Sequence, residues 1–271
     1  MTGRNGAPDI KRNGTPQMTH QDLAGRRALV TGGASGIGLA TDTMLAERGA
    51  RVAMNHLEGD PAGADQIARL IEAGLDVIAA PGNVAEPGTA EGMVETAISD
   101  LGGLDYLVNN AGISGTKDPI PPSDLDGITE ELWQALLTTH LISVFRVSKA
   151  AAKALKAAEG AIVNTASTSG VGLQGSSTPY AATKSGVVSV TRSLARGLAP
   201  AVRVNAVAPG QVATPWTADW PQERKQAALD KSLITRHVQP EDVAELACFL
   251  LTGGKMITGQ TIVIDGGMTI S

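Results

Sequence analysis

The chain has 271 residues, of which 42% are apolar and 18% charged, so it can bury a core and is not a disordered chain. Its net charge of −5 comes from acidic and basic residues mixed along the chain, which argues against a nucleic-acid binder with a basic face. No apolar run reaches the ~18 residues of a membrane span, and the first residues do not resemble a secretory signal, so we expect a cytoplasmic protein with no membrane partner. The single cysteine excludes an internal disulfide and disfavours a zinc site. We therefore expect no metal, and no nucleic-acid partner.

The first segment of the chain precedes any regular pattern. Residues 1–22 are rich in Gly, Pro, Asn and Thr and contain no apolar stretch, so they predict a flexible N-terminal extension. No break in composition follows, and we expect residues 23–271 to form a single domain.

From Arg27 onward, short apolar runs alternate with segments of helical spacing. The apolar runs predict seven strands, at residues 27–33, 51–55, 76–82, 104–112, 160–167, 202–210 and 260–267. The helical spacing predicts helices at residues 36–50, 63–74, 89–102, 130–155 and 180–198, with a further helical region before the last strand. This alternation predicts an α/β fold, a doubly wound seven-stranded parallel sheet with helices on both faces, that is, a Rossmann-like fold.

Four residues within these elements carry simple expectations. The first helix places Met44 and Leu45 on one apolar face. Tyr106 lies inside the apolar fourth strand, and Cys248 lies in an apolar segment, so both are expected in the core.

A glycine-rich turn, Thr31–Gly38, joins the first strand to the first helix. At such a turn the first N–H groups of the helix are unpaired and its dipole is positive, so a pyrophosphate binds there. Gly32 permits the tight turn, while Gly36 and Gly38 allow close approach of the phosphates and of the helix to the sheet. The turn therefore predicts a dinucleotide site.

The spacing Thr-Gly-x-x-x-Gly-x-Gly resembles that of the short-chain dehydrogenase/reductase family, and the resemblance covers roughly residues 23–270. Further motifs of the family follow in order: Asn109–Gly112 (NNAG), Ser167, Tyr180–Lys184 (YAATK) and Pro209–Thr214 (PGQVAT). The resemblance implies cofactor contacts from Gly32, Ser35, Gly36, Ile37, Gly38, Asn110, Ala111, Gly112, Tyr180, Lys184, Pro209, Gly210, Val212 and Thr214.

Tyr180 and Lys184 are four residues apart on a predicted helix and so share one face. A free tyrosine has a pKa of about 10, and a neighbouring ammonium is expected to lower that pKa. Tyr180 would then act as general acid/base on a carbonyl/alcohol pair, and Ser167 would donate a hydrogen bond to the same substrate oxygen. The family resemblance implies these same roles, and adds that Lys184 holds the hydroxyls of the nicotinamide ribose.

The end of the second strand distinguishes NAD from NADP in such folds, because an acidic residue there binds the ribose hydroxyls and repels a 2′-phosphate. This chain has Asn55 and His56 there, an ending that resembles NADP-using members, although no arginine follows and Asp60 lies nearby. We expect NADP(H) or NAD(H), with NADP(H) favoured. The third strand ends in Asn83-Val84, where the Asn83 amide could accept a hydrogen bond from adenine.

His140 stands where the family resemblance predicts an asparagine, the fourth member of a Ser-Tyr-Lys-Asn set. In the family this asparagine stabilises a local distortion of the helix and helps hold a water that links the lysine to solvent. Three interpretations stay open: His140 fills the same space, it carries protons because imidazole titrates near neutrality, or the relay is impaired. We expect His140→Asn to keep activity and to alter its pH profile.

The segment after the sixth strand, residues 214–242, lies where the family places a substrate lid. Trp216 and Trp220 either form the wall of an apolar or ring-shaped pocket or pin the lid to the core. Two helices with small residues such as Ala151, Ala152 and Ser189 correspond to those that many relatives use to pair subunits, so the resemblance implies a homotetramer or a homodimer.

The sequence thus predicts an oxidoreductase that transfers a hydride between NAD(P)(H) and a small-molecule carbonyl or secondary alcohol, with Tyr180 as acid/base. Two alternatives stay open. One is reduction of a C=N or C=C bond on the same scaffold, by an imine or enoyl reductase. The other is a catalytically silent protein that senses the dinucleotide. Loss of turnover with intact cofactor affinity in Tyr180→Phe would favour an enzyme.

Overall fold

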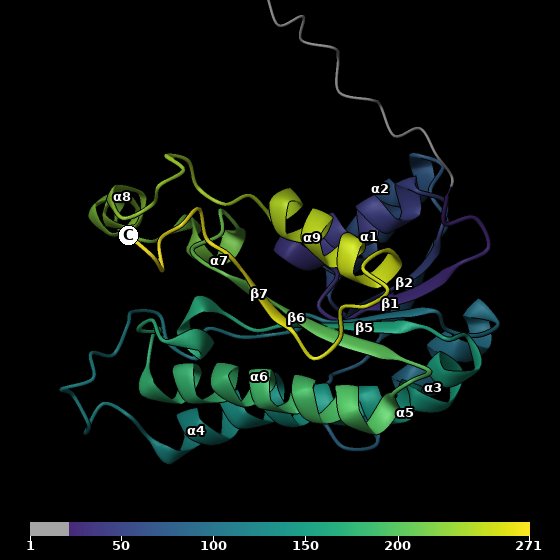
Figure 1. Ribbon diagram of the computed structural model, residues 1–271, viewed down its shortest axis with the longest axis horizontal. Helices are drawn as coiled ribbons and strands as arrows, with labels where there is room; N and C mark the ends of the chain where they lie inside the picture. The colour runs from purple at the N-terminus through teal and green to yellow at the C-terminus, as the bar shows by residue number, and fades with distance from the viewer. Residues whose placement is uncertain (1–21) are drawn as a thin grey trace, which may run out of the picture.

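The computed structural model describes residues 22–271 (Figure 1). The predicted N-terminal extension therefore lies outside the described residues, apart from Asp22. The strands are β1 (Arg27–Val30), β2 (Arg51–His56), β3 (Val77–Pro81), β4 (Tyr106–Asn109), β5 (Ala161–Thr165), β6 (Arg203–Pro209) and β7 (Thr261–Ile264). They form one seven-stranded sheet in the order β3-β2-β1-β4-β5-β6-β7, and every neighbouring pair is parallel.

Helices cover both faces of this sheet (Figure 1). One face carries α1 (Gly36–Glu47), α2 (Pro61–Glu72) and α9 (Pro240–Thr252). The other carries α3 (Thr89–Leu101), α4 (Glu130–Leu136), α5 (Ser143–Ala157) and α6 (Thr178–Leu198). The short helices α7 (Pro215–Ala218) and α8 (Gln222–Asp230) follow β6 and lie beyond the sheet. The predicted doubly wound, Rossmann-like fold is confirmed.

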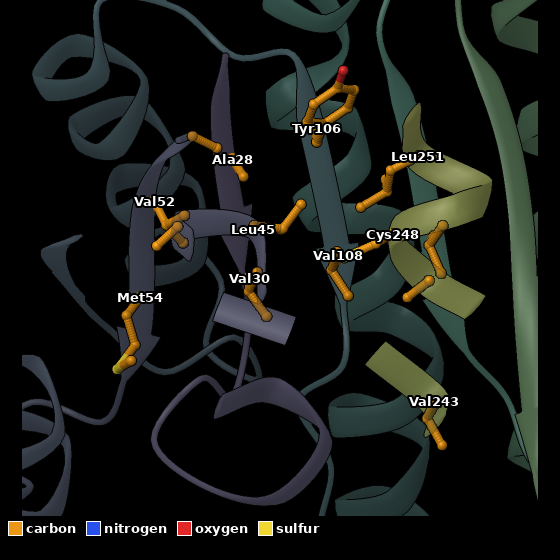
Figure 2. Close-up of a cluster of buried hydrophobic side chains, with 14 of the residues drawn as sticks. Ala28, Val30, Leu45, Val52, Met54, Tyr106, Val108, Val243, Cys248 and Leu251 are labelled. Atoms are coloured by element: carbon orange, nitrogen blue, oxygen red, sulfur yellow. The ribbon is translucent and has the colours of Figure 1, made fainter. Parts of the chain in front are cut away.

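The core has two main layers, one on each side of the sheet, and both are mainly aliphatic. Figure 2 shows part of the layer between the sheet and α1 and α9, where Val30, Leu45 and Leu251 converge. Tyr106 and Cys248 are buried in this layer, as expected. Burial raises the pKa of the Cys248 thiol to about 12, so this cysteine stays protonated and unreactive at neutral pH.

The helix predicted over residues 130–155 is interrupted. Between α4 and α5 the chain forms one π-helical stretch, Leu137–Ile142, which we call the π-turn. A π-turn inserts one extra residue per turn and so changes the direction in which the following side chains point. Here it contains His140, whose side chain is buried against α6.

The buried face of α1 differs from the predicted one. Leu45 is buried as expected, but Met44 is only partly buried, while Thr41 and Asp42 are fully buried. The Asp42 carboxyl lies beneath the glycine turn, because a Cβ added to Gly33 would overlap it. Neither carboxyl oxygen has a hydrogen-bond partner among the described residues, and burial raises the pKa of Asp42 well above its ordinary value.

Candidate active site

A cavity of about 630 Å³ lies at the carboxyl ends of the strands. Its walls come from the segments that follow β1, β2, β4, β5 and β6, together with α7 and α8. Ligands of open parallel sheets bind at this edge, next to the point where the strand order reverses. In this sheet that point lies at β1, whose neighbours are β2 and β4.

The start of α6 and the end of β5 bring three predicted catalytic side chains to the cavity. The Ser177 hydroxyl caps α6 by accepting a hydrogen bond from the Tyr180 N–H (3.3 Å). Tyr180 and Lys184 follow one helical turn apart, and Ser167 comes two residues after β5. All three line the cavity, and the Lys184 ammonium lies 5.8 Å from the centre of the Tyr180 ring.

Burial dominates the titration of this set. The Lys184 ammonium donates to the Thr165 carbonyl (2.9 Å), yet its burial lowers the Lys184 pKa to about 8. Burial also raises the pKa of Tyr180, and a hydrogen bond with Ser167 only partly opposes this effect. The expected net lowering of the Tyr180 pKa is therefore wrong for this arrangement, because the effect of burial is the largest. Tyr180 is a neutral phenol at neutral pH and can donate a proton.

His140 does not line the cavity but lies behind Tyr180, and their rings meet edge to face with centres 5.4 Å apart. Its Nε2 accepts a hydrogen bond from the Ile113 N–H (3.0 Å), so the neutral ring carries its proton on Nδ1. That proton is donated to the Thr183 hydroxyl (3.3 Å), which in turn donates to the Tyr180 carbonyl (2.8 Å). His140 thus ties the segment after β4 to the backbone of α6.

The charge state of His140 also differs from the expectation. Burial, and then the nearby Lys184 charge, lower the pKa of His140 to about 2. The interpretation in which His140 carries protons requires a ring that titrates near neutrality, and this pKa contradicts it. His140 is neutral and buried, and its ring bonds the Ile113 N–H and the Thr183 hydroxyl, which supports the first of the three interpretations.

The glycine turn provides a cradle for a dinucleotide. Gly32 and Gly36 have φ values of +64° and +53°, which favour glycine. A Cβ on Gly32 would lie 2.8 Å from the Ala111 Cα, and one on Gly38 would overlap the Gly32 carbonyl oxygen. The first turn of α1 has no acidic side chain, and Ser35 provides no side-chain cap, so its N–H groups are available to a pyrophosphate. These residues fit a nicotinamide dinucleotide.

The segment after β4 is fixed to this turn. The Thr31 hydroxyl accepts hydrogen bonds from the N–H groups of Asn110 (2.9 Å) and Ala111 (3.1 Å). The Asn110 amide donates to the carbonyls of Thr31 and Gly32, each at 3.2 Å. The two loops therefore form one rigid wall of the cavity.

Most of the predicted cofactor-binding residues come together here. Those that line the cavity are Gly32, Ser35, Gly36, Ile37, Asn55, His56, Asn110, Ala111, Gly112, Tyr180, Lys184, Pro209, Gly210, Val212 and Thr214. Gly38, Asn83 and Val84 do not line it. The Asn83 amide instead closes the turn after β3, because its oxygen accepts from the Ala85 N–H (3.0 Å) and its nitrogen donates to Glu86 (2.8 Å).

Asn55 and His56, the two residues at the end of β2, have different surroundings. Asn55 is buried, and its amide donates to the Ala80 and Gly82 carbonyls (2.9 Å each) and accepts from the Gly32 N–H (3.2 Å). It therefore supports the glycine turn from below. His56 contacts the Leu57 carbonyl through Nδ1 (2.9 Å), whereas its buried Nε2 has no partner within residues 22–271.

Several residues that line the cavity were not predicted from the sequence. They include Leu57, Gln174, Arg224, Lys231 and Met268. A signal for two of them was present in the sequence, because Trp220, Arg224 and Lys231 follow one another at helical spacings of four and seven residues. Trp216 and Trp220 both line the cavity, and Trp216 meets the Tyr180 ring edge-on with centres 6.4 Å apart. The wall interpretation of these tryptophans is thereby supported.

The described part of the chain has neither a metal-binding cluster nor a membrane-spanning helix. Residues 22–271 contain no group of His, Cys, Asp and Glu that could hold a metal ion. None of the helices in the same range has the length and apolar character needed to span a membrane.

Comparison with known proteins identifies the family. Residues 32–269 match the family model described as "Enoyl-(Acyl carrier protein) reductase". The 3-oxoacyl-[acyl-carrier-protein] reductase FabG of Staphylococcus aureus is 39% identical over 248 residues, which are 90% of this chain and 98% of that protein. Cis-4-hydroxycyclohexanecarboxylate dehydrogenase of Sinomonas cyclohexanicum is 38% identical over 252 residues, 91% of this chain and 98% of that protein.

Solved structures of similar proteins support the same family assignment. A short-chain dehydrogenase from Burkholderia cenocepacia in complex with NADP has a TM-score of 0.82 and 33% identity, with 91% of this chain and 99% of that chain covered. A gluconate 5-dehydrogenase from the same species, in complex with NADP and tartrate, has a TM-score of 0.84 and 29% identity, with 93% and 98% covered. The chain belongs to the short-chain dehydrogenase/reductase family and is an NAD(P)(H)-dependent oxidoreductase of carbonyl and alcohol substrates.

Proposed function

We propose that this oxidoreductase works with Tyr180 as general acid/base, Lys184 as its electrostatic partner and Ser167 as the group that orients the substrate oxygen. One observation carries the proposal. Ser167, Tyr180 and Lys184 line the same cavity as the glycine turn, so a substrate oxygen beside Tyr180 lies in the space that a bound dinucleotide shares.

The pKa directions support a mechanism for carbonyl reduction. The bound nicotinamide supplies the hydride. The neutral Tyr180 phenol donates its proton to the substrate oxygen, while Ser167 donates a hydrogen bond to the same oxygen. The Lys184 ammonium then stabilises the phenolate that remains. Because the Lys184 pKa is lowered to about 8, this charge is present below that pH, and we expect kcat/KM for reduction to fall above it.

A preference for NADP(H) over NAD(H) is part of the proposal. His56 occupies the position at which an acidic side chain would repel a 2′-phosphate, and it lines the cavity. The NADP complex of the Burkholderia relative supports the same preference. Asp60 also lines this end and opposes it, so the ratio of Kd values for NADPH and NADH is the direct measurement.

The relatives support a carbonyl or secondary alcohol on an aliphatic carbon as the reacting group. Their names specify a 3-oxoacyl group, cis-4-hydroxycyclohexanecarboxylate and gluconate. In each case a C=O/CH–OH pair is interconverted. The family-model description favours a second candidate, enoyl reduction, so a substrate screen includes an enoyl thioester and an imine beside ketones.

The decisive variant is Tyr180→Phe, which removes only the phenol oxygen. We expect kcat to fall by about 10²–10⁴-fold, because the proton donor is lost, while the Kd for NADPH changes by less than about twofold. Tyr106→Phe is the matched control, since Tyr106 is the only other tyrosine and lies in the core. Turnover that survives in Tyr180→Phe would contradict the proposed role and favour a sensor or a different acid.

We also propose a homotetramer, a dimer of dimers, in the cytoplasm. The π-turn and α5 expose Ile142 and Phe145 to 44% and 53%, and a separate patch at and after α9 exposes Phe249 and Met256 to 50% and 96%. Apolar side chains so exposed favour burial in a subunit interface. Two distinct patches supply the two interfaces that a dimer of dimers requires.

A further inference from the structure

We propose that the substrate carries a carboxylate, and that Arg224, assisted by Lys231, binds it on the lid side of the cavity. The inference rests on the proposed function, because it concerns the substrate of the same site. It extends that function by naming a substrate class, the low-molecular-weight oxo acids and hydroxy acids.

The distribution of charge around the cavity is the first observation. Four ionised side chains line it: Asp60 at the end of β2, Lys184 beside Tyr180, and Arg224 and Lys231 in and just after α8. The acidic residues of the lid segment 214–242, Asp219, Glu223, Asp230, Glu241 and Asp242, do not line it. The lid side of the cavity is therefore cationic.

The second observation is the state of Arg224. Its guanidinium carbon lies 3.3 Å from the centre of the Trp220 ring, so the group stacks on the indole. In the described part of the chain, this guanidinium forms no hydrogen bond and no ion pair. Asp118 acts on it only at longer range and raises its pKa, whereas burial, the larger effect, lowers that pKa. A stacked guanidinium keeps its N–H edge free and oriented, which suits the two oxygens of a carboxylate.

Lys231 adds a second cation on the same side of the helix. Arg224 and Lys231 are seven residues apart, two helical turns, so both lie on the face that also carries Ala227 and Ala228. Lys225 lies on another face, donates to the Ala218 carbonyl and does not line the cavity. The chain thereby offers a matched control on the same helix.

The third observation is the character of the space beside these cations. Trp216, Trp220, Leu173 and Met268 line the cavity together with Tyr180. A substrate that fills this space has an apolar body, with the reacting carbonyl at Tyr180 and the carboxylate at Arg224. The acyl part of a 3-oxoacyl thioester carries no charge and would leave the oriented guanidinium without a partner at this end of the cavity, so we favour the oxo acid.

The test compares acids with their own esters. The probes are 4-oxopentanoate and 4-oxocyclohexanecarboxylate, each paired with its methyl ester, and reduction is followed with NADPH. We expect the wild type to prefer each acid in kcat/KM, and Arg224→Gln to lower the acid/ester ratio by about 10–100-fold. Arg224→Lys should have a smaller effect, because lysine keeps the positive charge but lacks the paired N–H groups that bind both carboxylate oxygens. Lys225→Gln should leave the ratio unchanged, and circular dichroism checks that each variant is folded.

A second measurement separates this proposal from the proposed function. Trp216 and Trp220 line the cavity, so acid binding to the NADP-loaded protein can be followed by tryptophan fluorescence without turnover. Acids that bind the wild type but not Arg224→Gln, with no reduction, would support the carboxylate site and contradict the proposed reaction. A wild type that prefers neither acid, or an Arg224→Gln variant that affects acid and ester equally, would overturn the carboxylate site.

Discussion

The carboxyl of Asp42 is buried beneath the glycine turn without a hydrogen-bond partner in residues 22–271, and its pKa is raised well above the ordinary value. In the unfolded chain the same carboxyl ionises near a pKa of about 4. Between these two pKa values the folded protein binds one proton more than the unfolded chain. The free energy of unfolding therefore falls as the pH rises through that window.

Asp42→Asn removes this titration while keeping the size of the side chain. We expect the variant to be more stable than the wild type, and the difference to grow with pH by about 1.4 kcal/mol per unit while Asp42 stays protonated in the folded protein. Urea unfolding without cofactor at several pH values between about 5 and 8 measures it. Asp65→Asn, on the exposed face of α2, is the control and should show no such trend. A difference that is constant with pH would show that Asp42 titrates normally.

At the scale of the element, the π-turn lies between α4 and α5 and contacts α6 through His140. His140 receives the Ile113 N–H and reaches the Tyr180 carbonyl through Thr183, so one side chain connects three segments. An imidazole with a pKa of about 2 is neutral at every pH at which the enzyme would be assayed. The expectation that His140→Asn alters the pH profile is therefore replaced.

We now expect His140→Asn to keep kcat within about tenfold of the wild type, because an amide oxygen can still accept one hydrogen bond. The pH profile of kcat/KM should keep the wild-type shape between about pH 6 and 9, with the fall above about 8 that the Lys184 pKa produces. His140→Phe, which leaves the Ile113 N–H unpaired, should lose about 1–3 kcal/mol of stability. A shift of the kcat/KM pH profile in His140→Asn would instead support the interpretation in which His140 carries protons.

The elements differ in how far the sequence predicted them. Hydropathy predicted the strands, and spacing predicted the Tyr180–Lys184 pair. Both signals can be read from one sequence without knowledge of the fold. The π-turn did not, because a change from i−4 to i−5 hydrogen bonds leaves no separate hydropathy period. The raised Tyr180 pKa required knowledge of burial, which depends on the whole fold. The helical spacing of Trp220, Arg224 and Lys231 could be read from the sequence. That these side chains face the cavity became clear only from the position of α8.

At the scale of the whole molecule, the exposed apolar patches predict an assembly. We expect the wild type to elute with four times the 27.7 kDa protomer mass in size-exclusion chromatography with light scattering. Phe145→Glu should yield dimers, because a charge cannot be buried in the α5 interface. Leu125→Glu, at a 73% exposed position in the loop before α4, should leave the mass unchanged. A monomeric wild type would contradict the assembly.

The order of the sheet has one more consequence. Strands β1 to β4 occupy one half of the sheet and β5 to β7 the other, so the chain passes between the halves once, through the largely exposed segment 113–129 and then α4 and α5. The first half holds the dinucleotide cradle, and the second holds Ser167, Tyr180 and Lys184. The β4–β5 seam and the packing of α9 on α1 join them. Because each half supplies a different part of the site, we expect that neither half alone carries the chemistry.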